Sequence, residues 1–360
     1  MRDATTEAGC RTRSSPMRAM AVTAYGEPLE AIDVDEPRLR PGFALLEVLT
    51  CGVCFSDVKT SRGKMPYSES LQLPHIPGHE ICGRVIETDP AGAIPTGTTV
   101  VAYHIWPCRR CERCRAGYDN LCTNPVSWTG FTNPGGFRDR LVVPLDRLTV
   151  VPDNIDPVQA APLTCALGTA YRAVVTRGEV AAGTTAVIIG LGGVGIHALQ
   201  IARATGARVV GLDVSQPSID AALDLDLDAR ASNDDVLDAI VRDRSVDGVD
   251  VVIDCVGREE TLVQADRLVR PGGRVVAVGY SITSSFSLPT PRFVLEEIEL
   301  IGSRYVLMDE LERAIRLVAD GHVRMVVDKG RPLEDVNDAI ADLEAGNVIG
   351  RTVIDVAGVA

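Results

Sequence analysis

Four cysteines in the run PCRRCERCRAGYDNLC follow the spacing C-x2-C-x2-C-x7-C, at Cys108, Cys111, Cys114 and Cys122. This spacing lets one short loop offer four thiolates to a single ion, and Zn²⁺ takes a closed tetrahedral shell of four thiolates at structural sites. Cysteines separated by only two residues are too close to be ordinary disulfide partners. The alternatives are an iron–sulfur cluster and a cysteine-rich surface loop without a metal. We predict a structural zinc ion, because the chain carries a second, different metal constellation.

A glycine-rich run of the type G-x-G-x-x-G predicts a dinucleotide site. It follows an apolar stretch at 184–190 and opens a segment, 194–206, with apolar residues at helical spacing. Glycines at such a turn let backbone N–H groups approach a pyrophosphate at the start of a helix. The alternative is a glycine-rich turn that binds nothing. The residues that we predict to contact the cofactor here are Gly190, Gly192, Gly193, Val194 and Gly195.

The choice of dinucleotide depends on Asp213, which ends the next apolar stretch after the glycine-rich run. A carboxylate at this point can accept hydrogen bonds from the adenosine ribose diol, and it repels a 2′-phosphate. No arginine stands nearby to bind such a phosphate. The sequence therefore favours NAD over NADP.

Composition and charge exclude several classes of protein. At 360 residues, with 46% hydrophobic and 24% charged residues, the chain is typical of a soluble globular protein of two domains. A formal charge of −13 disfavours nucleic acid as a partner, because phosphate backbones are negative. No stretch approaches the roughly 20 apolar residues of a membrane span. We expect the polar residues 1–16 to be a disordered tail, not a secretory signal, and the protein to be cytoplasmic, with its thiols reduced.

The elements that must position these residues fall into two groups. Short β-rich runs punctuated by Pro and Gly predict a partly antiparallel, barrel-like domain, at 19–25, 43–53, 82–88, 98–103 and 137–144. From about residue 165, apolar strands alternate with helical segments, which predicts a doubly wound parallel sheet with strands at 184–190, 208–214, 249–257 and 272–279. The tail predicts helices at 310–321 and 334–346 and a last strand at 350–356. The repetitive run LDLDLDA at 223–229 is interpreted as a helix end that leads into a strand.

Three further segments complete a family resemblance. With the cysteine loop and the glycine-rich run, CGVCFSD (51–57), PGHE (77–80) and PLTCALGTAY (162–171) resemble the zinc-dependent medium-chain alcohol dehydrogenases. The resemblance covers essentially residues 18 to 356. It implies an α/β protein with a GroES-like β-rich catalytic domain and a Rossmann NAD-binding domain with a doubly wound parallel sheet. The ranges that it implies are 17–166 and 305–360 for the catalytic domain and 167–304 for the cofactor domain.

The same resemblance makes Cys54, His79 and Cys165 the ligands of a catalytic zinc ion. Two thiolates and one imidazole leave a fourth position open for water or a substrate oxygen, as catalytic zinc requires. Cys51 and Cys54 also form a C-x-x-C pair of the kind found in redox proteins, but only Cys54 stands at the family's ligand position. We interpret Cys51 as a small core residue, and we assign Cys10, Cys82 and Cys255 to the tail or the core.

Other residues take supporting roles by the same resemblance. Asp57 orients the histidine ligand, and Ser56 passes the alcohol proton onward. Glu80 tunes the metal site or exchanges as a transient ligand. The residues that the resemblance places at the cofactor are Thr169, Gly279 and Arg351, the last at the pyrophosphate, with a solvated strand charge as the alternative for Arg351.

The chain departs from the family pattern at two positions. Lys59 stands where many members carry the histidine that ends the proton relay, so either a lysine with a lowered pKa or water takes that role. Phe55 stands where some members have a basic residue near the pyrophosphate, which predicts weaker binding and faster release of the dinucleotide. The residues expected near the substrate suit a bulky or aromatic alcohol, and they are Phe55, His104, Phe131, Tyr280 and Arg304.

The resemblance implies reversible NAD(H)-linked oxidation of an alcohol to its aldehyde or ketone, with two zinc ions per chain. Zinc supplies Lewis-acid chemistry that lowers the pKa of the substrate hydroxyl. The alternatives are a polyol, amino-alcohol or specialised biosynthetic secondary-alcohol dehydrogenase of the same family, a zinc-free reductase of the same fold, and a catalytically silent NAD-binding protein. The short stretch between Cys122 and Phe137 is typical of tetrameric members, so we expect a homotetramer rather than a dimer. The only other partner expected is a small-molecule substrate.

Overall fold

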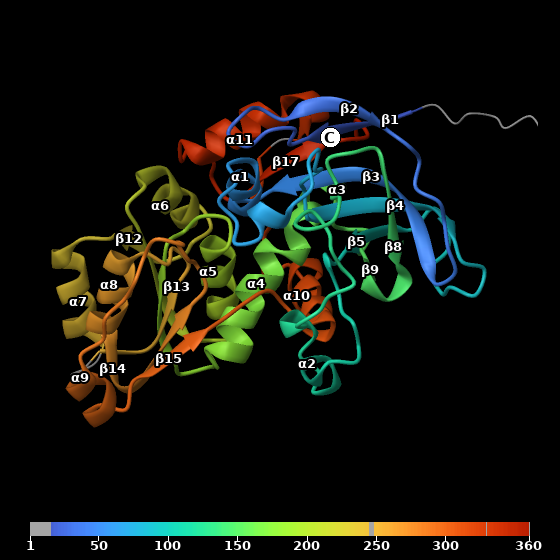
Figure 1. Cartoon of the computed structure of the whole chain (residues 1–360). Helices are drawn as coiled ribbons and strands as arrows, with labels where there is room; N and C mark the ends of the chain where they lie inside the picture. Colours follow the sequence, from blue (N-terminus) through green and yellow to red (C-terminus); the bar gives the residue numbers. More distant parts are fainter. Residues whose placement is uncertain (1–15, 245–247, 329, 360) are drawn as a thin grey trace, which may run out of the picture.

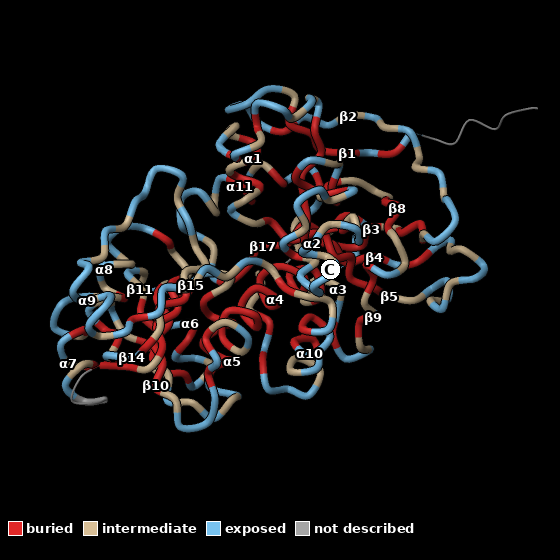
Figure 2. The backbone as a smooth tube through the Cα atoms, turned by 60° about the horizontal axis from the view of Figure 1, so that its bottom comes forward, coloured by how far each residue is buried: buried red, intermediate tan, exposed pale blue. Residues whose placement is uncertain are grey.

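The computed structural model describes residues 16–244, 248–328 and 330–359, and the chain forms two lobes (Figure 1). The tail predicted at 1–16 lies outside the described residues except for Pro16, so that prediction stays open. Buried backbone runs through the centre of both lobes, with exposed loops around it (Figure 2). Among the described helices, none combines the length and apolar character that crossing a bilayer demands.

One lobe is built on a parallel sheet whose strand order is β12-β11-β10-β13-β14-β15. Apolar side chains on both faces of its central strands are buried, which is typical of a parallel sheet covered on both sides. Within β10, Ile188 packs in one apolar cluster with Ala198, while its neighbour Val187 packs in another with Leu237. The strands are β10 (Thr185–Ile189), β11 (Arg208–Asp213), β12 (Ala229–Ala231), β13 (Val249–Asp254), β14 (Val269–Ala277) and β15 (Glu299–Gly302). The predicted doubly wound sheet is therefore confirmed.

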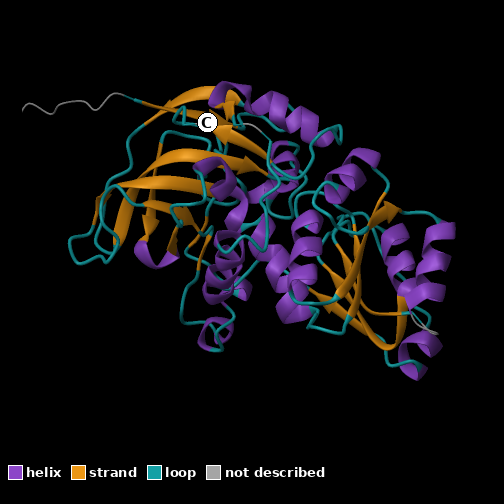
Figure 3. Cartoon of the chain, turned by 180° about the vertical axis from the view of Figure 1, so that it is seen from behind, coloured by secondary structure: helices purple, strands orange, loops and turns teal. Residues whose placement is uncertain are grey.

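Helices cover both faces of this sheet (Figure 3). They are α5 (Gly195–Ala204), α6 (Gln216–Leu223), α7 (Asp234–Arg244), α8 (Glu259–Leu268) and α9 (Thr290–Leu295). The run at 223–229 joins the end of α6 to the start of β12, as predicted. The strand order reverses between β10 and β13, and parallel sheets bind ligands outside the carboxyl ends of the strands at such a point.

The other lobe contains a mainly antiparallel sheet with the order β16-β17-β3-β4-β5-β9, and β8 pairs with β3. This arrangement confirms the predicted partly antiparallel first domain. Its strands are β3 (Phe43–Val53), β4 (Glu80–Thr88), β5 (Thr99–Ala102), β8 (Arg140–Pro144), β9 (Leu148–Val150), β16 (Arg331–Pro332) and β17 (Thr352–Asp355). Two small sheets add β1 (Met17–Ala21) with β2 (Glu30–Val34) and β6 (Ile105–Trp106) with β7 (Ser127–Trp128). The strands β2, β6 and β7 were not predicted from the sequence, and neither were β9, β15 and β16.

The end of the chain returns to the first lobe. In β17, Ile354 lies opposite Cys51 of β3, so the last strand completes a sheet begun some 300 residues earlier in the chain (Figure 1). The remaining helices are α1 (Phe55–Ser61), α2 (Glu112–Arg115), α3 (Pro157–Ala160), α4 (Ala166–Tyr171), α10 (Met308–Ala319) and α11 (Val336–Glu344). This pairing brings segments from both ends of the chain together, while the residue ranges of the two domains stay a prediction.

A buried ion pair joins α10 to the segment that follows α4. One nitrogen of the Arg172 guanidinium donates to both carboxylate oxygens of Glu310, at 2.7 and 2.8 Å, and each side chain is only 5% exposed. Glu310 also accepts from Thr176 Oγ1 at 2.6 Å and from the backbone N–H of Leu307 at 2.8 Å. All lone pairs of the carboxylate are thus directed at donors, which a buried charge requires.

Replacing this carboxylate by an amide tests how strongly the ion pair holds α10. We expect Glu310→Gln to lower the free energy of unfolding by about 3 kcal/mol, because it leaves a buried guanidinium without its counter-charge. Urea unfolding followed by circular dichroism measures the change. The control is Glu312→Gln, an exposed position on the same helix, for which we expect a change within about 0.5 kcal/mol. Equal stability of the two variants would show that the buried pair adds nothing.

Candidate metal and dinucleotide site

Four potential metal ligands from separate segments meet between the two lobes. Cys54 lies between β3 and α1, His79 and Glu80 stand at the start of β4, and Cys165 directly precedes α4. One ligand atom from each of the four lies within 4.8 Å of the others. The structure thus brings together the three residues predicted to hold the catalytic zinc, and it adds a carboxylate to them.

The chemistry of this donor set fits a zinc ion. Zinc bonds to sulfur and nitrogen of about 2.0–2.3 Å place the ligand atoms of a tetrahedral site less than about 4 Å apart, which is compatible with the observed spacing. His79 is fully buried, and its Nε2 atom has no hydrogen-bond partner among the described residues. A hydrogen bond from Cys165 holds the pKa of Cys54 well below its usual range, so one thiolate is favoured even without a cation. A buried imidazole nitrogen without a partner is the atom that a metal would satisfy.

Asp57 fixes the backbone and the imidazole of this cluster. Its carboxylate is 1% exposed, and it accepts from the backbone N–H groups of Cys54 at 2.8 Å and Gly78 at 3.1 Å. Its Oδ1 lies 3.4 Å from Nδ1 of His79. Burial disfavours the charged imidazole, but Asp57 and the thiol of Cys54 outweigh it and raise the pKa of His79 to about 10. The aspartate therefore turns Nε2 toward the cluster, as carboxylates next to histidine ligands do.

Arg351 connects the metal ligands to the glycine-rich loop. Its Nη2 lies 3.1 Å from Oε1 of Glu80, and both side chains are almost fully buried. A Cβ atom added to Gly193 would stand 2.8 Å from the guanidinium carbon of Arg351, so this loop packs directly on the arginine. Burial raises the pKa of Glu80 to about 7, although Arg351 opposes the shift. One guanidinium therefore contacts both the candidate metal site and the loop predicted to bind the pyrophosphate.

The glycine-rich loop has the backbone geometry that a dinucleotide needs. Gly190 has φ +86°, in the left-handed region, and it follows β10 at the start of the turn. A Cβ on Gly195 would stand 1.7 Å from the Gly190 carbonyl oxygen, whereas one on Gly192 would meet nothing within 4 Å. Gly195 is thus required for the turn itself, while Gly192 leaves an open approach at the start of α5. Such an opening fits a phosphate group.

Asp213 lies beside this loop. Its carboxylate accepts from the backbone N–H of Leu191 at 2.5 Å and of Ser215 at 2.8 Å. The side chain thereby ties the end of β11 to the glycine-rich turn. Two other predicted cofactor positions are also placed. Thr169 is 8% exposed. The backbone of Gly279 packs against Gly257, because a Cβ atom added to Gly257 would stand 2.1 Å from the carbonyl carbon of Gly279.

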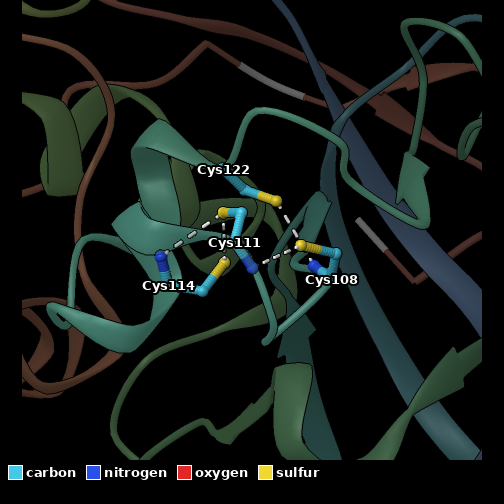
Figure 4. A group of neighbouring side chains, drawn as sticks. All are labelled: Cys108, Cys111, Cys114 and Cys122. Atoms are coloured by element: carbon cyan, nitrogen blue, oxygen red, sulfur yellow. Dashed lines mark hydrogen bonds between the residues drawn. The ribbon is translucent and has the colours of Figure 1, made fainter.

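The four cysteines of the loop around α2 point toward one another (Figure 4). Their sulfur atoms lie within 4.8 Å of one another, and none of the described cysteines forms a disulfide. Backbone N–H groups point at the sulfurs: Cys108 donates to Cys122 Sγ at 3.3 Å, and Cys111 donates to Cys108 Sγ at 3.4 Å. The hydrogen bond from the Cys114 backbone lowers the pKa of Cys111 to about 5. The pKa of Cys108 is lowered as well, by backbone hydrogen bonds, whereas burial raises that of Cys114. At Cys108 and Cys111 the arrangement therefore favours the thiolate, the form that binds a metal.

Aromatic rings pack against His79, and sequence reasoning found only part of this group. Phe131 lies 4.4 Å and His104 5.5 Å from the His79 ring, measured between ring centroids, and both were predicted to lie near the substrate. Burial lowers the pKa of His104 far below its usual value, with the charges of His79 and Arg304 adding to the effect. Trp128 and Tyr305 were missed. Their positions are the only sequence signal that could have identified them: Trp128 follows the cysteine loop, and Tyr305 follows the last parallel strand.

Phe55 and Lys59, the two positions at which the chain departs from the family pattern, lie at the junction of the lobes. Phe55 is 48% exposed, while Nζ of Lys59 donates to the Tyr280 carbonyl at 3.0 Å and lies 3.9 Å from the centroid of its ring. Ser56 is half-buried and lies in the first turn of α1, where its carbonyl accepts from Thr60 Oγ1 at 2.9 Å. Cys51 is buried within the first lobe, as its interpretation as a core residue requires.

Comparison with known proteins gives matches over nearly the whole chain. Two family models match: "Alcohol dehydrogenase GroES-like domain" at residues 40–153 and "Zinc-binding dehydrogenase" at residues 193–320. An alcohol dehydrogenase of Geobacillus stearothermophilus is 33% identical, over 94% of this chain and 98% of its own length. A NAD-dependent alcohol dehydrogenase of Sulfurisphaera tokodaii is 32% identical, over 94% of this chain and 99% of its own length. The crystal structure of the alcohol dehydrogenase from Aeropyrum pernix has a TM-score of 0.86 at 30% identity and covers 94% of this chain and 100% of its own.

Two alanine substitutions in the glycine-rich loop test its geometry at Gly195, where the backbone approaches closely, and at Gly192, where the space is open. We expect Gly195→Ala to lower the free energy of unfolding by about 2 kcal/mol or more, because its Cβ would overlap the Gly190 carbonyl and force the turn apart. Gly192→Ala is the matched control, with a change within about 0.5 kcal/mol, since its Cβ meets open space. Urea unfolding of both variants measures the difference. If Gly192→Ala were the more destabilising of the two, the turn would not depend on the close approach at Gly195.

Proposed function

Because the chain belongs to the zinc-dependent medium-chain alcohol dehydrogenase family, we propose that it is an NAD(H)-linked alcohol dehydrogenase. It would transfer hydride reversibly between an alcohol and its aldehyde or ketone. The observation that carries the proposal is the convergence of two thiols, an imidazole and a carboxylate at one point, with Arg351 bridging from that carboxylate to the glycine-rich loop. A metal that polarises a substrate oxygen and a dinucleotide that exchanges hydride are the two components that this reaction needs.

In this proposal Cys54, His79 and Cys165 hold the catalytic zinc. When bound, zinc supplies Lewis-acid polarisation of the substrate oxygen. Asp57 keeps the His79 ring in the orientation that presents Nε2 to the metal, through its contact with Nδ1. His79, Cys165 and Asp57 are buried and Cys54 is half-buried, which limits the access of water and strengthens the electrostatic contacts within the cluster.

We propose that Glu80 tunes the metal site and that Arg351 controls whether the Glu80 carboxylate is available to the metal. The ion pair between them keeps one oxygen of Glu80 directed at the guanidinium. Arg351 therefore competes with the metal for this carboxylate and leaves a coordination position for the substrate. Because the same guanidinium contacts the loop at Gly193, binding of a pyrophosphate there would weaken its hold on Glu80.

The proton of the alcohol is proposed to leave through Ser56 Oγ. Burial lowers the pKa of Lys59, yet its Nζ already donates to the Tyr280 carbonyl. We propose that Lys59 holds Tyr280 against α1, and that water accepts the proton after Ser56. Asp213 is proposed to bind the adenosine ribose and to select NAD.

The four-cysteine loop is proposed to hold a second, structural zinc ion, which would give two ions per chain. The domain ranges 17–166 with 305–360 and 167–304 are likewise proposals, supported by the two sheets. The short stretch between Cys122 and Phe137 supports a tetramer, and light scattering distinguishes it from a dimer. A polyol, amino-alcohol or biosynthetic secondary-alcohol dehydrogenase has the same core and differs only in its substrate.

Zinc content and activity of three cysteine variants test the proposed function. We expect the native protein to contain two zinc ions and to oxidise NADH with aldehydes or ketones. Cys54→Ser should lose one ion and all turnover while it still binds NADH, and Cys111→Ser should lose the other ion and melt at a lower temperature. Plasma mass spectrometry, an NADH assay across a carbonyl panel and NADH fluorescence provide the readouts. The control is Cys51→Ala, a buried cysteine outside both clusters, which should keep both ions. Turnover by metal-free protein contradicts the proposal.

Cofactor choice is tested at Asp213. Asp213→Asn removes the charge and keeps an acceptor oxygen for one of the two backbone N–H groups. We therefore expect kcat/KM for NADPH to rise about tenfold relative to NADH, equivalent to roughly 1.4 kcal/mol of lost repulsion. Steady-state kinetics with both dinucleotides measure this ratio. Asp220→Asn, on the outer side of α6, is the charge control and should leave the ratio unchanged. A native enzyme that already prefers NADPH would refute the role assigned to the carboxylate.

A further inference from the structure

We propose that the substrate of this site carries a carboxylate apart from the reacting carbon, and that Arg304 binds this carboxylate. The inference rests on the proposed function and adds the substrate class. It predicts an alcohol, or the corresponding aldehyde or ketone, whose reacting group and acid group are separated by an apolar or aromatic portion.

Arg304 lies at the outer end of a continuous row of rings that begins at the metal ligands. Phe131 lies 4.4 Å from His79, and Trp128 stacks on Phe131 at 4.5 Å, measured between ring centroids. The guanidinium carbon of Arg304 lies 5.0 Å from the centroid of Trp128 and 4.7 Å from that of Tyr305. Along this row, two rings therefore separate the imidazole of the candidate metal site from a positive charge.

The arginine is held in place, but its charge has no partner among the described residues. Its backbone carbonyl accepts from Asn120 Nδ2 at 2.8 Å, and Asn120 is only 2% exposed, so the chain at this point is anchored to the four-cysteine loop. Contacts with two rings orient the guanidinium. Across the part of the chain that the structure describes, the Arg304 side chain forms no ion pair and no hydrogen bond. A stacked guanidinium keeps its N–H edge free for a planar, bidentate acceptor such as a carboxylate.

The charge around Arg304 contrasts with that of the whole chain. The formal charge of −13 repels anions at long range, and several exposed arginines, such as Arg267 and Arg313, lie against carboxylates. A second cation, Lys59, lies over the ring of Tyr280, and the charge of Arg304 also acts on that tyrosine. Two cations beside aromatic rings give a local positive potential that favours an anionic group.

A second polar group lies between the metal ligands and Arg304. His104 is 1% exposed, and neither of its ring nitrogens has a hydrogen-bond partner among the described residues. Its ring contacts both His79 and Tyr305, at 5.5 and 4.7 Å between centroids. A buried imidazole offers one donor and one acceptor, and leaving both unpaired is unfavourable unless a ligand supplies the partner. The row of rings therefore combines apolar surface with polar contacts at both ends, which fits a substrate that is apolar in the middle and acidic at its far end.

Binding of a matched pair of probes tests the inference. para-(Hydroxymethyl)benzoate and its methyl ester share the ring and the alcohol but differ in charge. Isothermal titration calorimetry with the full-length, zinc-replete protein should show tighter binding of the acid by about tenfold or more. Arg304→Gln should abolish that preference and leave the binding of the ester unchanged, and Arg304→Lys should restore part of it. Arg316→Gln, an exposed position on α10, removes one positive charge elsewhere and should behave as the native protein.

The same variants are then assayed for NADH oxidation with para-formylbenzoate and its methyl ester. We expect kcat/KM to fall about tenfold for the acid alone in Arg304→Gln. Equal binding of acid and ester by the native protein would overturn the inference, and so would an equal loss for both probes in Arg304→Gln. If calorimetry shows the charge preference while no carbonyl compound is reduced, the inference about Arg304 holds and the proposed dehydrogenase activity fails.

Discussion

The buried ion pair between Glu80 and Arg351 is the contact on which the organisation of the site depends. Glu80 begins β4 beside the candidate metal ligands, and Arg351 leads into β17, a strand of the same sheet and the last in the chain. The guanidinium also touches the glycine-rich loop of the other lobe. Two charges so fully removed from water are stable only together. The pair therefore fixes the position of the last strand, of the metal ligands and of the loop relative to one another.

Unsatisfied buried polar atoms concentrate at this site. They include both nitrogens of His79, both nitrogens of His104 and Nε1 of Trp128. Elsewhere in the described chain, a buried charge such as Glu310 has a full set of donors. Since an unpaired buried polar group is unfavourable, a group of such atoms around one site marks a place where other molecules or ions can complete the structure. The metal ligands, the row of rings and Arg304 belong to this one region.

Residue spacing was sufficient to predict a site whose residues all lie within one short segment of the chain. The four cysteines from Cys108 to Cys122 and the glycine-rich run each lie within one short segment, so their convergence needs no distant partner. The parallel sheet was also predictable, because its central strands are mainly apolar runs that alternate with helical patterns. Residues that depend on distant contacts were harder to find. Trp128 and Tyr305 carry no local signal, since their role follows from packing against residues far away in sequence.

The sequence by itself determined the fold class and predicted the four-cysteine loop and the glycine-rich loop, because residue type and spacing fix which groups one segment can present. The set Cys54, His79 and Cys165 followed only from the family resemblance, since its members come from three segments. Only the tertiary structure decided how the parts meet. It paired Arg351 with Glu80, turned Lys59 onto Tyr280, and left the guanidinium of Arg304 without a carboxylate partner in the part of the chain that the structure describes. Such pairings depend on which charges the packing of the two lobes brings within a few ångströms and removes from water. Distances of that kind are set by long-range strand pairing and helix packing, and no local pattern contains them.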